Sequence, residues 1–526
     1  MSDITFHPLS SLARGLIQSL EEKEHTRHEE HAVTVNPIVS KLASWYERVR
    51  NAMEYREDEV VLRATIERIL KRRLLLGGDG KTTAEPLIKE LLWARYLPAN
   101  EVPLSTVKKV EESIDLYLDL RLAVLRDHKM SQELINDWTY DLMSADIQYI
   151  LNPKREKEIM ANFMFHVLRD DVTIVDDTKE TKDAQVFMGV RRAYARDDLA
   201  FLRYQLFTQY FGRLTKHNLV HTASHFPKGY AEIMRELSYP VKDKIYTYIK
   251  RRTAAFFILE DILNLNKDNL KTMLEQEEDL KEAVFEACEK RYNSVSTKVG
   301  RAIVRSVIFL LLTKVAFAFF VEGTYERIVY GEIQWRTLII NTATPPLLMI
   351  IVSLFIRPPG LANSRLILSY MKELLYTETP RLGNKLTVHK QEKRDKTFES
   401  VFNALWLLAF ALSFGGIIFI LTKLHFNPVS QFVFIFFLAI VSFLAYRISL
   451  IANIYRVGER QGLLTFIVDF LFMPVIRVGR RLTQTVAQIN IFLMFFDFFI
   501  ESPFKYMFAF FDQWFRFLHA KTEELE

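Results

Sequence analysis

Lys314 lies near the middle of an apolar run over residues 303–321. An ammonium group at such a depth in a bilayer costs roughly several kcal/mol, so the side chain must reach the interface, pair with an acid, or face water. Asp469, Asp497 and Glu501 are the acids expected to meet it. Such a pair can form an ion or proton path. The alternative is a structural role, as a buried pair between helices or a side chain that snorkels.

A second polar feature interrupts the apolar run over residues 337–356, where Asn341 and Thr344 precede Pro345 and Pro346. Each proline lacks the backbone N–H that would bond a carbonyl one turn earlier in a helix. The sequence therefore predicts a break in this helix, and broken helices form ion sites in transporters. A plain kink is the alternative.

Three histidines, His217, His221 and His225, recur every four residues. If one helix runs through them, His217 and His221 lie one turn apart, a spacing at which two imidazoles can share a metal ion. His225 would lie ~12 Å from His217 along the helix axis, too far to join the same ion. A metal site at His217 and His221 is one hypothesis, and ordinary surface histidines are the alternative.

No constellation of catalytic residues stands out. The segment GGDGKTT at 77–83 has the end of a phosphate-binding loop, but Leu75 occupies the position of the first glycine, so we expect the glycine-rich end of a helix. The single cysteine, Cys288, excludes an intrachain disulfide and a cysteine metal cluster. We predict no catalytic residue and no cofactor. A membrane-bound enzyme with a lipid-like substrate is a third, weaker hypothesis.

The elements that must position these residues are mostly helices. Four apolar runs are each about 20 residues long, enough for a helix to cross ~30 Å of hydrocarbon. They cover residues 303–321, 337–356, 401–422 and 429–446, and the chain before residue 300 contains no such run. The sequence predicts an all-α protein, with a soluble multi-helix N-terminal domain followed by a polytopic α-helical transmembrane domain.

Basic residues predict the orientation of these runs. Residues 357–400, between the second and third runs, are rich in Lys and Arg, so the positive-inside rule assigns this loop to the cytoplasm and the N-terminus with it. We therefore predict a multi-pass protein of the plasma membrane with a cytoplasmic N-terminus. The basic side chains expected to face lipid headgroups are Lys390, Lys393, Arg394, Lys396, Arg477, Arg480 and Arg481.

The chain after residue 456 does not fit a simple crossing. The apolar stretch 462–476 is shorter than a span, contains Asp469, and has arginines at both ends, which favours a re-entrant or surface segment. Residues 488–519 gather Asp497, Glu501 and other polar residues on one narrow stripe of a helix. This stripe is typical of a deeply sunk interfacial helix or of a tilted crossing that faces a bundle interior.

The predicted domains follow these patterns. Residues 1–169 form an N-terminal helical lobe that begins with an amphipathic helix, 170–183 an acidic linker, and 184–300 a second helical lobe. Residues 301–456 form the four-helix transmembrane domain with its basic loop 357–400. Residues 457–526 form a membrane-associated region.

Charge composition limits the partners. Lys and Arg total 69 and Asp and Glu 64, for a net charge of +5, which argues against a nucleic-acid partner. We expect an integral membrane protein whose cytoplasmic helical domain is an interaction or scaffolding module. Its partners would be membrane lipids and either another protein or a second copy of the chain. The alternative is an ion or small-solute channel or transporter that uses Lys314, the break at 341–346 and Asp469.

Overall fold

The computed structural model of the chain is predominantly helical in the part it describes, and the all-α prediction is confirmed. Four short strands in this part form two two-stranded sheets. The described residues are 7–21, 32–35, 58–265 except 76 and 98–100, 270–390 except 334, 396–458, and 470–482 except 471, with scattered residues of 39–47 and 507–518.

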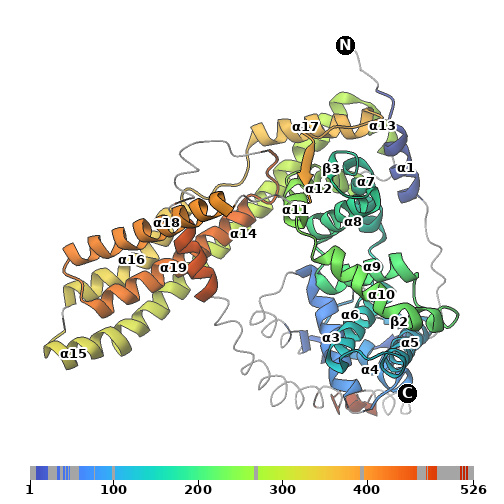
Figure 1. Cartoon of the computed structure of the whole chain (residues 1–526), viewed down its shortest axis with the longest axis horizontal. Helices are drawn as coiled ribbons and strands as arrows, with labels where there is room; N and C mark the ends of the chain where they lie inside the picture. Colours follow the sequence, from blue (N-terminus) through green and yellow to red (C-terminus); the bar gives the residue numbers. More distant parts are fainter. Residues whose placement is uncertain are drawn as a thin grey trace. The chain divides into compact units, whose positions relative to one another are not determined.

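Contacts divide the chain into two units (Figure 1). The N-terminal unit contains residues 14–250, 383–390 and 491–526, and the C-terminal unit contains residues 1–13, 251–382 and 391–490.

The N-terminal unit holds ten α-helical and π-helical segments of the described chain besides most of α1 (Ser11–Glu21). They are α3 (Asp58–Leu74), α4 (Gly80–Trp93), α5 (Leu104–Asp127), α6 (Gln132–Leu151), α7 (Arg155–Leu168), α8 (Lys179–Val190), η1 (Arg191–Ala195), α9 (Leu199–Phe211), α10 (Leu219–Leu237) and α11 (Lys242–Lys250). Strands β1 (Ala32–Thr34) and β2 (Glu101–Pro103) pair antiparallel, and β3 (Val172–Val175) and β4 (Leu386–His389) pair parallel.

The core of this unit lies among α3, α4, α5, α6, α9 and α10. Its fully buried side chains include Tyr117, Phe207 and Leu87. On each of their helices, buried apolar residues follow one another at intervals of three or four positions, as one face of a helix requires. The glycine-rich segment 77–83 ends α3, with Gly77 at a φ of +86°. It then starts α4, where Asp79 accepts a hydrogen bond from the backbone N–H of Thr82 at 2.8 Å. The prediction of a helix end at this segment is confirmed.

The acidic segment 170–183 differs from the expected linker. Val172 and Ile174 are buried and Thr173 between them is exposed, an alternation that suits a strand. This strand, β3, pairs with β4 from the basic loop 357–400, with Val172 opposite Leu386 and Val175 opposite His389. The pairing links residues more than 200 positions apart, which local patterns do not reveal.

The C-terminal unit contains the apolar helices. Its elements are α12 (Thr253–Leu265), α13 (Leu270–Glu275), α14 (Glu277–Phe317), η2 (Ala318–Gly323), α15 (Thr324–Tyr330), α16 (Trp335–Ser353), α17 (Leu361–Tyr376), α18 (Lys396–Lys423) and α19 (Pro428–Ala452). Residues 472–482 are also helical. Within the described residues, four helical stretches are long and apolar enough to cross a membrane, and they coincide with the four predicted runs.

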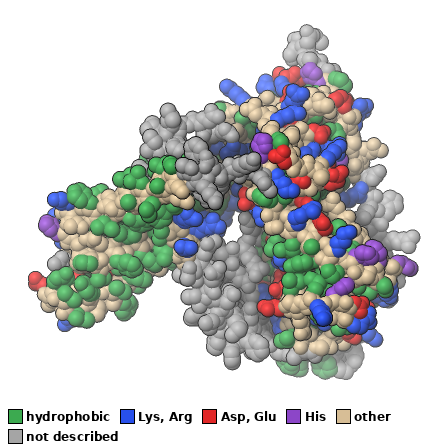
Figure 2. All heavy atoms as spheres, viewed as in Figure 1, with side chains coloured by type: hydrophobic (Ala, Val, Ile, Leu, Met, Phe, Trp, Pro, Cys, Tyr) green, Lys and Arg blue, Asp and Glu red, His purple; other side chains and the backbone are tan. Residues whose placement is uncertain are grey.

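Apolar side chains cover the outside of these four stretches. Phe320, Leu407 and Phe432 are 81%, 71% and 71% exposed. Figure 2 shows hydrophobic side chains dominating the surface of this part, whereas charged side chains are spread over the N-terminal unit. Such a surface is typical of helices that face lipid.

The chain before α1 packs on protein within the C-terminal unit. The backbone N–H of Ser10 donates to the carbonyl of Leu375 at 2.7 Å, and the ring of His7 stacks on Tyr376 at 4.8 Å. In α1 itself, Leu16 and Ile17 are buried. The amphipathic helix is confirmed, and protein covers these residues of its apolar face.

Candidate functional site

A buried polar cluster lies among the apolar helices of the C-terminal unit. Lys314 Nζ donates to Glu322 Oε1 at 2.5 Å, and both side chains are fully buried. The other carboxylate oxygen, Oε2, accepts hydrogen bonds from Asn341 Nδ2 and, at 3.4 Å, from Ser430 Oγ. The Lys314 ammonium also lies 5.0 Å from the centre of the Phe437 ring. Helices α14, α16 and α19 therefore meet at one carboxylate.

The π-helical turn η2 brings Glu322 into this cluster. In a regular helix, residues eight apart lie ~12 Å apart along the axis. The wider turns of η2 begin directly after α14 and contain Glu322, and the long side chain of Lys314 reaches forward to it. Single π-helical turns inside α-helices are often found at functional sites.

A second buried acid, Glu326, lies one turn further along. Its Oε1 accepts a hydrogen bond from Asn427 Nδ2 at 3.1 Å. The Asn427 Oδ1 atom accepts from the backbone N–H of Ser430 at 2.8 Å, which caps α19. One asparagine therefore starts α19 and ties it to α15.

The acid that meets Lys314 is not one of those expected. Asp469, Asp497 and Glu501 lie outside the described residues, and Glu322 occupies the position beside the ammonium. The sequence does not predict Glu322 as the partner of Lys314, because the apolar run ends at Val321 and Glu322 lies just outside it. Its spacing from Lys314 suggests no pair in a regular helix.

The predicted break at 341–346 is wrong, because α16 continues as a helix through Pro345 and Pro346. The Thr344 hydroxyl donates to the carbonyl of Ile340 at 2.6 Å. Asn341 is fully buried and lies in the polar cluster, within a continuous helix. Its Oδ1 atom has no hydrogen-bond partner among the described residues.

The basic residues expected at lipid headgroups have different surroundings. Lys390 Nζ is 2.8 Å from Asp177 Oδ2 in the N-terminal unit, so this side chain has a protein partner, and its contact with lipid stays a prediction. Although partial burial opposes the effect, hydrogen bonds from Lys390 and Tyr239 lower the pKa of Asp177 to about 2. The short strand β4 directs Lys390 to the protein because it pairs with β3.

The remaining basic positions are only partly described. Arg477 lies 5.3 Å from the centre of the Trp406 ring, and Arg480 and Arg481 are exposed on helix 472–482. These three remain candidates for lipid contact. Lys393 and Arg394, and the side chain of Lys396, lie outside the described residues.

The histidine spacing does not arise from one helix. Helix α10 begins at Leu219, so His217 lies in the preceding turn, while the rings of His221 and His225 stack at 4.4 Å. In the part of the chain that is described, no three His, Cys, Asp or Glu side chains form a group that could hold a metal ion. A two-histidine site at His217 and His221 stays a prediction, without its helical basis.

Comparisons with known proteins give this chain no relative. No family model, curated protein or solved structure matches it.

Proposed function

We propose that the chain is a multi-pass plasma-membrane protein whose apolar helices hold a cytoplasmic helical module at the bilayer, where the module binds a protein partner or a second copy of the chain. The observation that carries this proposal is α14, an uninterrupted helix of 41 residues. At ~1.5 Å per residue it is about 60 Å long, twice the thickness of a hydrocarbon layer of ~30 Å.

The first half of α14 is built into an extramembrane cluster. Arg291 forms an ion pair of 2.5 Å with Asp261 of α12, and Tyr292 OH accepts a hydrogen bond from Asn363 of α17 at 2.8 Å. Its last turns hold Lys314 in the polar cluster with α16 and α19. A continuous helix fixed at both ends is suited to rigid anchoring, because it contains no joint at which the two ends could move independently.

The Lys314–Glu322 pair supports an anchor. Both charges are neutralised inside the helix group, and the carboxylate is satisfied by hydrogen bonds from two further helices. Buried pairs of this kind are best attested as devices that fix register, and removing one partner leaves an uncompensated charge. In this role the polar residues hold the helices together and carry no solute.

Cross-linking and flux measurements on the full chain test the proposal. A photoreactive amino acid at exposed positions of the N-terminal unit should give a discrete cross-linked product in native membranes, either with another protein or with a second copy. The purified chain in liposomes should pass no ions above the rate of empty liposomes. Ion flux that Glu322→Gln abolishes without loss of folded protein, together with no cross-linked product, would overturn the proposal.

The second candidate function is cation or proton transport through the same cluster. Asn341 Oδ1 is buried without a partner and belongs to the residue that bonds Glu322, so this acceptor is able to bind a proton donor or a cation. In this mechanism Lys314 would be displaced from the carboxylate when the ion enters. Proton-driven or Na⁺-driven flux that depends on both Asn341 and Glu322 would favour transport over anchoring.

A further inference from the structure

Six exposed cations lie where the apolar surface of the C-terminal unit ends. They belong to α14, to the segment after α16, and to helix 472–482. These six boundary cations are Lys298, Arg301, Arg305, Arg357, Arg477 and Arg480. On α14 the residues that follow them, 306–321, carry no charge other than the buried Lys314. The boundary cations therefore mark the change from charged to apolar chain.

Helical rise places Arg305 and Arg357 at the same depth. Helices α14 and α16 pack along each other and run in opposite directions (Figure 1). The Glu322 carboxylate bonds Lys314 of α14 and Asn341 of α16, so it gives both helices a common reference point. Arg305 is about 17 residues from Glu322 and Arg357 about 16 from Asn341, so at ~1.5 Å per residue each lies roughly 25 Å from the carboxylate.

Helix 472–482 crosses α19 near this depth. Gly479 lies directly against residues 439–443 of α19, because an added Cβ atom would overlap the backbone there. These residues are roughly 14–20 Å along α19 from Ser430, which also bonds the Glu322 carboxylate. Arg477 lies 5.3 Å from the centre of the Trp406 ring. Tryptophan favours the boundary between hydrocarbon and headgroups, so this contact fits the same depth.

None of the boundary cations has a carboxylate partner among the described residues. Arg301 and Arg357 donate only to backbone carbonyls, each at 3.4 Å. The surrounding sequence contains no Asp or Glu over residues 290–321, 333–372, 400–458 and 470–482. Positive charges without a nearby negative charge repel one another, and a bound anion removes this repulsion.

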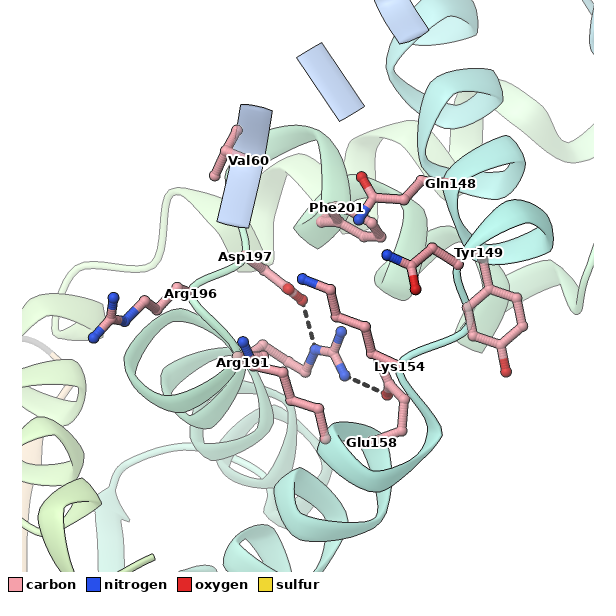
Figure 3. Close-up of a pocket in the computed structure, with 12 residues that line it drawn as sticks. Val60, Gln148, Tyr149, Lys154, Glu158, Arg191, Arg196, Asp197 and Phe201 are labelled. Carbon is pink, nitrogen blue, oxygen red and sulfur yellow. Dashed lines mark hydrogen bonds and ion pairs between the residues drawn. The ribbon is translucent and has the colours of Figure 1, made fainter. Parts of the chain in front are cut away.

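Where a carboxylate is near, this chain pairs its arginines with it. Further along α14, Arg291 forms an ion pair of 2.5 Å with Asp261. In the N-terminal unit, Arg191 donates to Asp197 at 2.6 Å and to Glu158, and Figure 3 shows these two carboxylates on opposite sides of its side chain. The boundary arginines have no such partner, so their guanidinium groups are available to an external anion.

We propose that the boundary cations bind the headgroups of acidic phospholipids in the leaflet next to the extramembrane part of α14. Guanidinium groups donate parallel hydrogen bonds to phosphate oxygens, and Arg301 and Arg305 lie one turn apart, so both can bond one headgroup. The lipid phosphate is the anion found at this depth, because the boundary cations begin where the apolar chain ends. This inference rests on the proposed function, since it requires the apolar helices to lie in a bilayer.

Electron paramagnetic resonance of spin-labelled lipids tests this site on the full chain reconstituted in phosphatidylcholine. Spin-labelled phosphatidic acid should show a larger protein-associated fraction than spin-labelled phosphatidylcholine. Arg301→Gln/Arg305→Gln should lower the relative association constant of phosphatidic acid about fivefold, because each arginine beside the headgroups favours acidic lipid. The matched control Lys281→Gln/Lys290→Gln removes two exposed cations of α14 that lie at least ~20 Å from Arg305, and should leave the constant unchanged.

Tryptophan fluorescence locates the bound lipid. Phosphatidic acid brominated in its acyl chains should quench Trp406, beside Arg477, more than brominated phosphatidylcholine does, and the difference between wild type and Trp406→Phe isolates this indole. Arg477→Gln/Arg480→Gln should remove the preference. Trp335, the first residue of α16 and thus at its other end from Arg357, is the control and should be quenched equally by both lipids.

The proposal is overturned if phosphatidic acid and phosphatidylcholine associate equally with the wild type, or if both arginine double variants, reconstituted as well as the wild type, keep its preference. In either case phosphatidylcholine still gives a protein-associated signal, so the anchoring proposal is not affected. The absence of a protein-associated signal from any lipid would instead show that the apolar helices do not lie in the bilayer, and would overturn both.

Discussion

Glu322 is the residue on which the helix group depends, because its carboxylate accepts hydrogen bonds from Lys314, Asn341 and Ser430 at once. Removing either member of a buried ion pair costs roughly 3–5 kcal/mol, whereas removing both charges is often nearly neutral. We therefore expect Lys314→Met and Glu322→Gln each to lower the thermal unfolding temperature in detergent strongly, and the double variant to regain most of the loss. The control Lys423→Met, at the exposed end of α18, should change little. Losses that simply add in the double variant would contradict a coupled pair.

Asp177 makes the free energy of unfolding depend on pH. Its pKa is lowered to about 2 in the folded chain by Lys390 and Tyr239 against the effect of burial, so its contribution to stability is present above its unfolded pKa of ~3.9 and is lost as pH falls toward about 2. Asp177→Asn should lower the free energy of unfolding by roughly 1–3 kcal/mol at pH 7, and the difference from wild type should close between pH ~4 and ~2. The neighbouring Asp176→Asn is the control, because its 3.6 Å pair with His389 is exposed. A gap that persists unchanged at acid pH would show that the charge of Asp177 is not responsible.

At the scale of elements, the sequence predicts what local composition determines and misses what distant contacts determine. The apolar runs predict α14, α16, α18 and α19 because length and hydropathy suffice for such helices. The π-helical turn that returns Glu322 to Lys314 and the pairing of β3 with β4 both depend on packing between segments, and no short pattern encodes them. The continuous α16 also shows that a helix can pass through two adjacent prolines, since neither Pro345 nor Pro346 ends it.

The contact between helix 472–482 and α19 can be tested with a pair of glycines. A Cβ atom on Gly479 would lie 2.0 Å from the carbonyl oxygen of Ala439, so the two backbones must approach closely there. Gly416 in α18 has open space around it. Alanine generally stabilises a helix by roughly 0.5–1 kcal/mol relative to glycine. We expect Gly416→Ala to be neutral or stabilising in thermal unfolding and Gly479→Ala to be destabilising. Equal effects of the two changes would mean that this contact does not form.

For the whole molecule, the anchoring proposal requires α14 to stay straight between the extramembrane cluster and the apolar helices. Spin labels at Lys281→Cys and Leu312→Cys, two exposed positions of α14 in a Cys288→Ser background, should lie roughly 47 Å apart along the axis at ~1.5 Å per residue. In nanodiscs, double electron–electron resonance between the two spin labels should give one narrow distance distribution. The 41-residue helix has no proline, and Gly300 lies between the two label positions with open space around it.

Gly300 supplies both the disruptive variant and its control. Gly300→Ala should leave the label distance unchanged, because its Cβ meets nothing and alanine favours the helix. Gly300→Pro removes a backbone hydrogen bond and crowds the preceding turn, so the distribution should broaden and shift to shorter distances. If the rigid helix is what couples the module to the membrane, Gly300→Pro should also weaken the cross-linked product while both variants insert in membranes equally. A broad distribution already present in the wild type would exclude α14 as a rigid anchor, whatever the behaviour of the variants.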